Sequence, residues 1–180
     1  MGQRRAEVLQ AAIELLDEVG LDGLTMRLLA SRLGVQAGAL YRHYSSKQAL
    51  LDAMVAHLAA PPADGVPPLD GPWDHQLRVL AIGTRELMLA HRDGARLMST
   101  FQNPGPEAVA FYHNLIATLT TAGISADVAA IAVDTVMAYV NGYTTEEQAR
   151  AIGSRPRELR DLAFRGGIEL IIAGVKGSLS

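Results

Sequence analysis

The stretch MRLLASRLGVQAGALYRH, residues 26–43, decides the fold of this 180-residue chain. It contains two short segments with helical apolar spacing, separated by a tight turn. Gly34 permits the turn, and the small side chain of Ala30 leaves room for the second segment. Leu29, Leu33 and Leu40 supply the apolar contacts that hold two such helices at a steep angle. The stretch therefore predicts a helix-turn-helix.

Capping signals on both sides extend the motif into a larger helical module. Residues 4–19 have an apolar face of helical period, and Gly20 follows as a natural stop. Thr25 is expected to cap the second helix. Ser45 begins the pattern Ser-Ser-Lys-Gln, a capping box with Gln48 at its third position, which opens a fourth helix reaching about residue 58.

A run rich in proline and glycine interrupts the helical pattern at residues 61–72, where no helix can persist. Beyond it, the apolar spacing indicates further helices and no strand. The expected fold is all-α, with an N-terminal three-helix helix-turn-helix domain and a helical ligand-binding and dimerisation domain. The expected boundaries are 1–46 for the helix-turn-helix domain, 47–60 for a connecting helix, 61–72 for the linker and 73–180 for the second domain. The helices expected there span about 73–92, 93–101, 106–122, 126–151 and 157–179.

The charge of the chain is unevenly distributed. The net charge is −3, which by itself argues against a partner as acidic as DNA. Residues 23–51, however, contain no Asp or Glu and carry four Lys or Arg, so this window is +4 and the rest of the chain is −7. Tyr41 and Tyr44 lie among these cations, as in surfaces that bind phosphate. The alternative is a solvated helix pair of any helical domain.

Composition and motifs weigh against several other functions. The chain has no cysteine, which excludes disulfides, thiolate zinc sites and cysteine nucleophiles. No motif of a hydrolase, metalloprotease or phosphate loop occurs, and the histidines lack ligand spacing. We therefore expect no catalytic residue, no metal site, no cofactor and no membrane span, and a cytoplasmic location. A helical sequestering or interaction protein without sequence-specific DNA binding is the alternative function.

The residues around the motif resemble the tetracycline-repressor (TetR) family of regulators. The matching segments are LLDEVGLDGLTMRLLASRLGV (15–35), LYRHY (40–44) and KQALL (47–51). The similarity continues in HRDGAR (91–96) and GIELIIAG (167–174), which are similar to segments of the family's regulatory domain. It covers most of the chain and is most specific over residues 11–54.

The resemblance implies a homodimer whose last two long helices pair with their copies in a four-helix bundle. Small residues suit close helix approach, and they recur in 126–140 and at Gly166, Gly167 and Gly174. They would equally reduce bulk inside a monomer. Two-fold symmetry matches a palindromic operator, which the family binds.

The resemblance also assigns residues to DNA. Arg27 falls at a position that contacts bases or phosphates, Tyr41 and Lys47 at positions that contact phosphate, and His43 near the end of the recognition helix. Tyr41 could instead be a packing residue. The run 37–39 departs from a Gln-Pro-Thr run in the family's tetracycline-responsive member, so a different operator is expected. The expected DNA-contacting residues are Thr25, Met26, Arg27, Gln36, Ala37, Gly38, Ala39, Tyr41, Arg42, His43 and Lys47.

On the ligand side, the residues that hold a tetracycline–magnesium complex in that member are replaced here. Pro62, Leu80, Thr84, Met98 and Leu115 stand at those positions, and Glu146 alone cannot make a magnesium site. The resemblance therefore implies a repressor that a small hydrophobic or aromatic effector releases. Met88, Met98 and Leu115 could each simply be core residues. The expected ligand-binding residues are Leu80, Thr84, Met88, Met98, Phe101, Tyr112, Asn114, Leu115, Tyr139 and Asn141.

Overall fold

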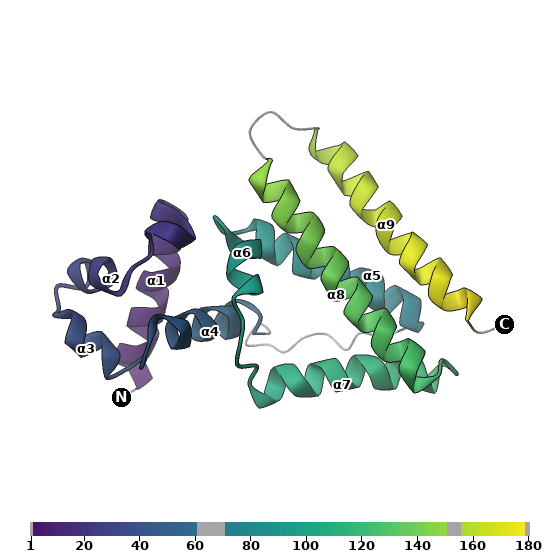
Figure 1. The fold of residues 1–180 in the computed structure, drawn as a ribbon, viewed down its shortest axis with the longest axis horizontal. Coiled ribbons are helices and arrows are strands. Elements are labelled where there is room, and N and C mark those ends of the chain that lie inside the picture. The colour runs from purple at the N-terminus through teal and green to yellow at the C-terminus, as the bar shows by residue number, and fades with distance from the viewer. Residues whose placement is uncertain (1, 61–70, 151–155, 179–180) are drawn as a thin grey trace. The chain divides into compact units, whose positions relative to one another are not determined.

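The computed structural model describes residues 2–60, 71–150 and 156–178, which form helices and no strand (Figure 1). The prediction of an all-α fold is confirmed. The chain divides into two compact units. Unit 1 comprises Met1–Ala60 and Leu87–Pro104, and unit 2 comprises Pro61–Glu86 and Gly105–Ser180. Most of the predicted linker, residues 61–70, lies outside the described residues, and so does Pro62. None of the described helices is long and apolar enough to cross a membrane.

The helix-turn-helix of unit 1 follows the predicted signals. The hydroxyl oxygen of Thr25 accepts a hydrogen bond from the backbone nitrogen of Leu28 at 3.1 Å, so Thr25 caps its helix. Gly34 has a φ of 65°, a left-handed conformation that glycine adopts without steric cost. The five helices of the described part of unit 1 are α1 (Gly2–Gly23), α2 (Met26–Arg32), α3 (Ala37–Tyr41), α4 (Lys47–Leu58) and α6 (Gly94–Ser99).

The cap of α4 differs from the prediction by one residue. Ser46, not Ser45, precedes the helix, and its hydroxyl oxygen accepts a hydrogen bond from the backbone nitrogen of Ala49 at 3.0 Å. The side chain of Gln48 does not complete a capping box. It donates instead to the carbonyl oxygen of Thr100 at 2.7 Å and to Asp52 at 2.9 Å. Gln48 therefore bonds to a distant residue instead of the helix start. The prediction of a capping box from Ser45 to Gln48 is wrong, because the capping residue is Ser46.

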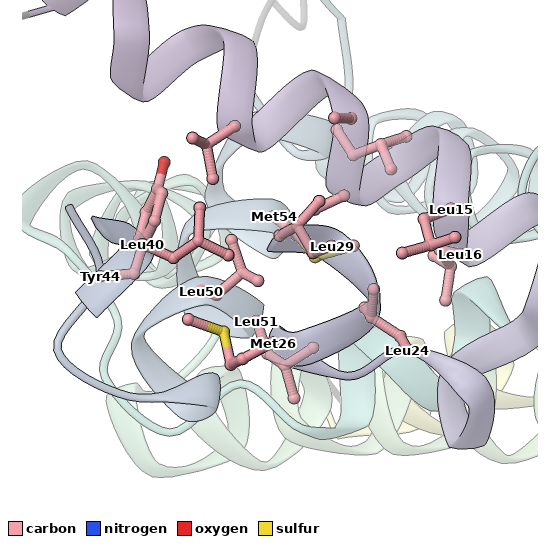
Figure 2. Packing of buried hydrophobic residues seen from close by; sticks show 14 of the residues in the cluster. Leu15, Leu16, Leu24, Met26, Leu29, Leu40, Tyr44, Leu50, Leu51 and Met54 are labelled. Carbon is pink, nitrogen blue, oxygen red and sulfur yellow. The ribbon is translucent and has the colours of Figure 1, made fainter. Parts of the chain in front are cut away.

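One apolar cluster holds unit 1 together (Figure 2). Figure 2 shows side chains of α1, α2, α3 and α4 converging on a common interior. Leu97 of α6 belongs to the same cluster and is fully buried, and Met98 and Phe101 pack against it. The burial of these apolar side chains stabilises the unit by roughly 1.5–3 kcal/mol for each large one. Fully buried members include Leu16, Leu24, Leu29, Leu40, Leu50 and Met54.

Carboxylates of α1 and α4 fix the segment 91–103 within unit 1. Asp17 accepts hydrogen bonds from the backbone nitrogen of Arg92 at 2.9 Å and from Nδ1 of His91 at 3.0 Å. Asp52 accepts from the backbone nitrogen of Gln102 at 3.1 Å and from the side chain of Asn103 at 2.7 Å. The segment is thereby bound to α1 and to α4, at two separate points.

Unit 2 is built from four helices in its described part: α5 (Trp73–Leu89, of which residues up to 86 belong here), α7 (Pro106–Thr121), α8 (Ala126–Ala149) and α9 (Arg157–Gly177). Helix α8 packs along both α7 and α9 (Figure 1). The core contains Leu77 of α5, Leu119 of α7, Val140 of α8 and Phe164 of α9, each buried.

A buried ionic network joins α5, α8 and α9. The guanidinium of Arg85, whose residue is 2% exposed, donates two hydrogen bonds to Glu147 at 2.8 Å each and one to Asp161 at 2.7 Å. Arg160 donates to Glu147 at 2.7 Å. Burial opposes ionisation of Glu147, but the hydrogen bonds from Arg85 and Arg160 hold its pKa below the usual value. These bonds fix the relative positions of three helices, because losing one partner would leave a buried charge.

Candidate nucleic-acid interface and ligand-binding region

The outer surface of α2 and α3 presents most of the long side chains expected to meet DNA. Arg27, Gln36, Tyr41 and Arg42 are exposed, and Tyr41 retains 49% of its accessible surface. Such exposure disfavours the alternative in which Tyr41 is a packing residue. The core residues Leu29 and Leu40 on the opposite faces of the same helices set this orientation. A rigid helix pair thus displays polar side chains outward.

Three cations of unit 1 have no hydrogen bond or salt bridge to another described residue: Arg27, Arg42 and Lys47. The remaining arginines of the unit are engaged. Arg4 pairs with Glu7, Arg5 lies over the ring of Tyr44, Arg32 pairs with Glu18, Arg92 donates to the carbonyl oxygen of Glu18, and Arg96 pairs with Asp22. These three cations are among the residues expected at the DNA surface, and none of them is neutralised by a salt bridge to a described carboxylate.

Arg32 is a cation of residues 23–51 that the structure shows to be neutralised within unit 1. It contributes to the +4 charge of residues 23–51, yet it is paired with Glu18 of α1, 14 residues earlier. The hydrogen bond from Arg32 lowers the pKa of Glu18, which keeps that carboxylate ionised. The charge available to a phosphate backbone therefore resides in Arg27, Arg42 and Lys47.

The other expected DNA-contacting residues fall in several environments. The side chain of Met26 lies in the core rather than on the surface expected of it, and Thr25 is occupied as a helix cap. Ala37, Ala39 and His43 are half-buried. Gly38 is exposed.

The residues expected to bind ligand are divided between the two units. Met88, Met98 and Phe101 belong to unit 1, where Met88 is 1% exposed and the other two pack on its core. This burial supports the reading of Met88 as a core residue. The remaining seven lie in unit 2: Leu80, Thr84, Tyr112, Asn114, Leu115, Tyr139 and Asn141.

Two of the expected polar ligand contacts already have partners in unit 2. The hydroxyl of Tyr112 donates to Asp134 at 2.9 Å. The hydroxyl of Tyr139 donates to the carbonyl oxygen of Phe164 at 3.2 Å, and its ring stacks on that of Phe164 with centroids 5.6 Å apart. Both side chains therefore fix helices to one another. Asn114 and Asn141 have no side-chain hydrogen bond to a described residue.

Unit 2 contains an open cavity of about 690 Å³ between the beginning of α5 and the second half of α7. Of the expected ligand residues, only Asn114 lines it. The sequence did carry a signal for this face, because Asn114, Thr118 and Thr121 recur at helical spacing on α7. In the described chain, no group of three His, Asp or Glu side chains is placed to hold a metal. The lining residues are Gly71, Pro72, Trp73, Gln76, Asn114, Ala117, Thr118, Thr121 and Ala122.

A helix-turn-helix with partner-free cations, attached to a separate helical unit, defines a DNA-binding regulator. Comparison with models of protein families leads to the same class of protein. Residues 8–54 match the model of bacterial regulatory proteins of the tetR family, and residues 67–162 match the tetracyclin repressor-like C-terminal domain. The chain belongs to the TetR family. Its members are ligand-responsive transcription regulators, not enzymes.

Individual relatives support the same placement. The class A tetracycline repressor from transposon 1721 of Escherichia coli is 43% identical over 79% of this chain, and the match spans 66% of that relative's length. A tetracycline repressor variant from Acinetobacter baumannii AYE, solved with minocycline, is 36% identical with a TM-score of 0.86, covering 96% of each chain. BioQ, solved with its natural double-stranded DNA operator, is 32% identical with a TM-score of 0.79, covering 95% of this chain and 96% of its own.

Proposed function

We propose that this protein is a transcriptional repressor that binds a palindromic operator as a homodimer in the cytoplasm and is released by a small hydrophobic or aromatic molecule. The observation that carries the proposal is a set of three cations without a hydrogen bond or salt bridge to a described residue: Arg27 and Arg42 on the helix-turn-helix, and Lys47 at the start of α4. Lysine and arginine side chains bind the phosphates of the DNA backbone when no carboxylate of the protein already neutralises them. BioQ, whose fold is similar, was solved on operator DNA.

Uncovered apolar faces on α8 and α9 support the homodimer. Leu162 and Leu170 of α9 are 69% and 76% exposed, and Ile131 of α8 is 64% exposed. They lie in rows of exposed apolar or small residues at helical spacing, which suit close packing with a second copy. The rows are Ile131, Thr135, Ala138 and Gly142 on α8, and Leu159, Leu162, Gly166, Leu170 and Gly174 on α9.

The chemistry of the expected ligand residues supports an effector other than tetracycline–magnesium. Leu80 and Leu115 of unit 2 offer no oxygen or nitrogen ligand to a hard cation. Such side chains suit an apolar molecule, and the amides of Asn114 and Asn141 would orient it.

The contacts of α4 within unit 1 suggest how an effector could release DNA. Gln48 and Asp52 of α4 bind the backbone of Thr100 and Gln102, which follow the expected ligand residue Met98. A ligand that displaced this segment would move α4 and, with it, the recognition helix. Release then requires only that the ligand bind the DNA-incompetent state more tightly.

Selection from a pool of randomised DNA duplexes tests the proposal. We expect purified protein to enrich an inverted repeat whose half-site centres lie one DNA turn, about 34 to 36 Å, apart, with two chains bound per duplex. A thermal-shift screen of apolar small molecules would then identify ligands, and these should lower operator affinity. Failure to enrich any sequence at low salt would overturn the proposal.

A further inference from the structure

The recognition helix α3 presents few side chains capable of hydrogen bonding. Residues 37–39 carry nothing longer than a methyl group. The exposed polar side chains on either side are Gln36, immediately before the helix, and Arg42, immediately after it. The carboxamide of Gln36 does not cap the helix and bonds to no other described residue. Both its donor and its acceptor are therefore available to an external partner.

Gly38 has no role that the fold of unit 1 explains. It lies within α3 and is absent from the residues with positive φ, so the backbone does not require glycine there. A Cβ placed on it meets no other atom of the chain within 4 Å. Glycine inside a helix is less stable than alanine, because it loses more conformational freedom on folding. The described chain therefore gives no reason for glycine at this position, and the missing side chain leaves room for an external group to approach α3.

We propose that α3 selects its operator half-site through Gln36, which reads an adenine, and through a notch at Gly38 that admits the edge of a base pair. This inference rests on the proposed function. In the major groove, Nε2 of glutamine donates to N7 of adenine while Oε1 accepts from the N6 amino group. No other common base edge offers that donor and acceptor pair.

The methyl groups beside the notch complete the recognition chemistry. Ala37 and Ala39 flank Gly38 in the sequence and are half-buried, so both residues remain partly accessible. Methyl groups contact the C5-methyl of thymine favourably, but they cannot form hydrogen bonds with the donor or acceptor groups of a G·C pair. The half-site is accordingly expected to be A·T-rich where it faces residues 36–39.

Base analogues test the assignment of Gln36 on the operator obtained by selection. In that operator, one adenine per half-site is replaced by purine, which lacks the N6 amino group, or by 7-deazaadenine, which lacks N7. The wild-type protein should lose roughly 5- to 150-fold in affinity for each half-site modified at that adenine. Gln36→Ala should bind the natural and modified duplexes equally, whereas the control Gln10→Ala, an exposed glutamine of α1, should discriminate like wild type.

The outcomes separate this inference from the proposed function. If selection yields no operator, the proposed function fails. If an operator is found but Gln36→Ala retains full discrimination at every adenine, the assignment of Gln36 is overturned while the function stands.

The notch is tested with Gly38→Ala, which should fold normally because the added methyl meets only open space. We expect at least a tenfold loss of operator affinity, an unchanged affinity for non-specific DNA and a thermal midpoint no lower than wild type. Gly83→Ala is the matched control, since Gly83 of α5 is also helical and has no neighbour within 4 Å of its Cβ position. Wild-type operator affinity in Gly38→Ala would refute the notch.

Discussion

The carboxylate of Asp93 accepts a hydrogen bond from the backbone nitrogen of Leu21 at 2.9 Å. Gly20 makes this contact possible. It has a φ of 74°, and a Cβ at that position would lie 2.7 Å from Oδ2 of Asp93. Gly20 is the one described residue of α1 with non-helical backbone angles, and it kinks the helix there. This kink and the position of segment 91–103 in unit 1 therefore depend on one another.

Replacement of Gly20 by alanine should destabilise unit 1 by about 2–4 kcal/mol, because it adds both backbone strain and the clash with Asp93. Urea denaturation followed by circular dichroism measures this loss. Gly34→Ala is the control, since Gly34 has a φ of 65° but no atom within 4 Å of its Cβ position. It should cost only about 1 kcal/mol for strain. Equal losses of unfolding free energy in the two variants would show that the position of Asp93 does not depend on Gly20.

Gly167 of α9 plays a comparable part in unit 2. A Cβ there would lie 2.1 Å from the hydroxyl and 2.3 Å from Cζ of Tyr139, whose ring is held by Phe164 and Tyr143. Gly167→Ala should therefore lower the free energy of unfolding by roughly 1–3 kcal/mol. In Gly83→Ala, which adds a methyl to open space, thermal unfolding should be unchanged or slightly stabilised. An unaffected midpoint in Gly167→Ala would show that Tyr139 is not fixed as described.

Acid should weaken unit 2 through Asp74. The hydrogen bond from Lys176, 2.6 Å away, and a further one from Arg78 lower the pKa of Asp74 from 3.8 to about 2. The ionised carboxylate therefore stabilises the fold above about pH 4, and this contribution, at most about 2 kcal/mol, is lost as the pH falls toward 2. Lys176→Met should flatten the difference in stability between pH 4 and pH 2. An identical pH dependence in both proteins would rule out the Lys176 contact.

The exposed face of α9 should govern assembly. Leu170→Glu places a charge on a side chain that is 76% exposed and would be buried twice in a homodimer. Losing two buried leucines weakens association by roughly 3–6 kcal/mol, before any cost of burying the charge. Sedimentation equilibrium should show a wild-type dimer and a monomeric variant with an unchanged helical spectrum. A dimeric variant would place the interface elsewhere.

The fold was largely predictable because its signals are local. Thr25 as a cap, Gly34 as the turn and the apolar spacing of Leu29 and Leu40 each act within a few residues. The cap of α4 was misplaced for the opposite reason, since Gln48 bonds to Thr100, 52 residues away, instead of closing a local box.

The candidate sites were harder to predict because they depend on distant partners. Nothing near Arg32 in the sequence indicates that Glu18 neutralises it, and nothing near Tyr139 indicates that Phe164 fixes it. Likewise, Leu97 looks like any apolar residue of the second domain until it is found buried in the core of unit 1. Pairing and burial across long sequence separations decide which side chains remain available to a ligand or to DNA.

The salt dependence of operator binding tests the central claim most directly. Fluorescence anisotropy would measure the affinity for the selected operator across a series of NaCl concentrations in wild type, Arg27→Ala, Lys47→Ala and the control Arg150→Ala, whose arginine pairs with Glu146. Each lost phosphate contact should lower the slope of log affinity against log salt by about 0.9 per subunit. We predict shallower slopes for Lys47→Ala and Arg27→Ala and an unchanged slope for Arg150→Ala. A wild-type protein that binds the operator no better than scrambled DNA, or equal slopes in all four proteins, would contradict the account.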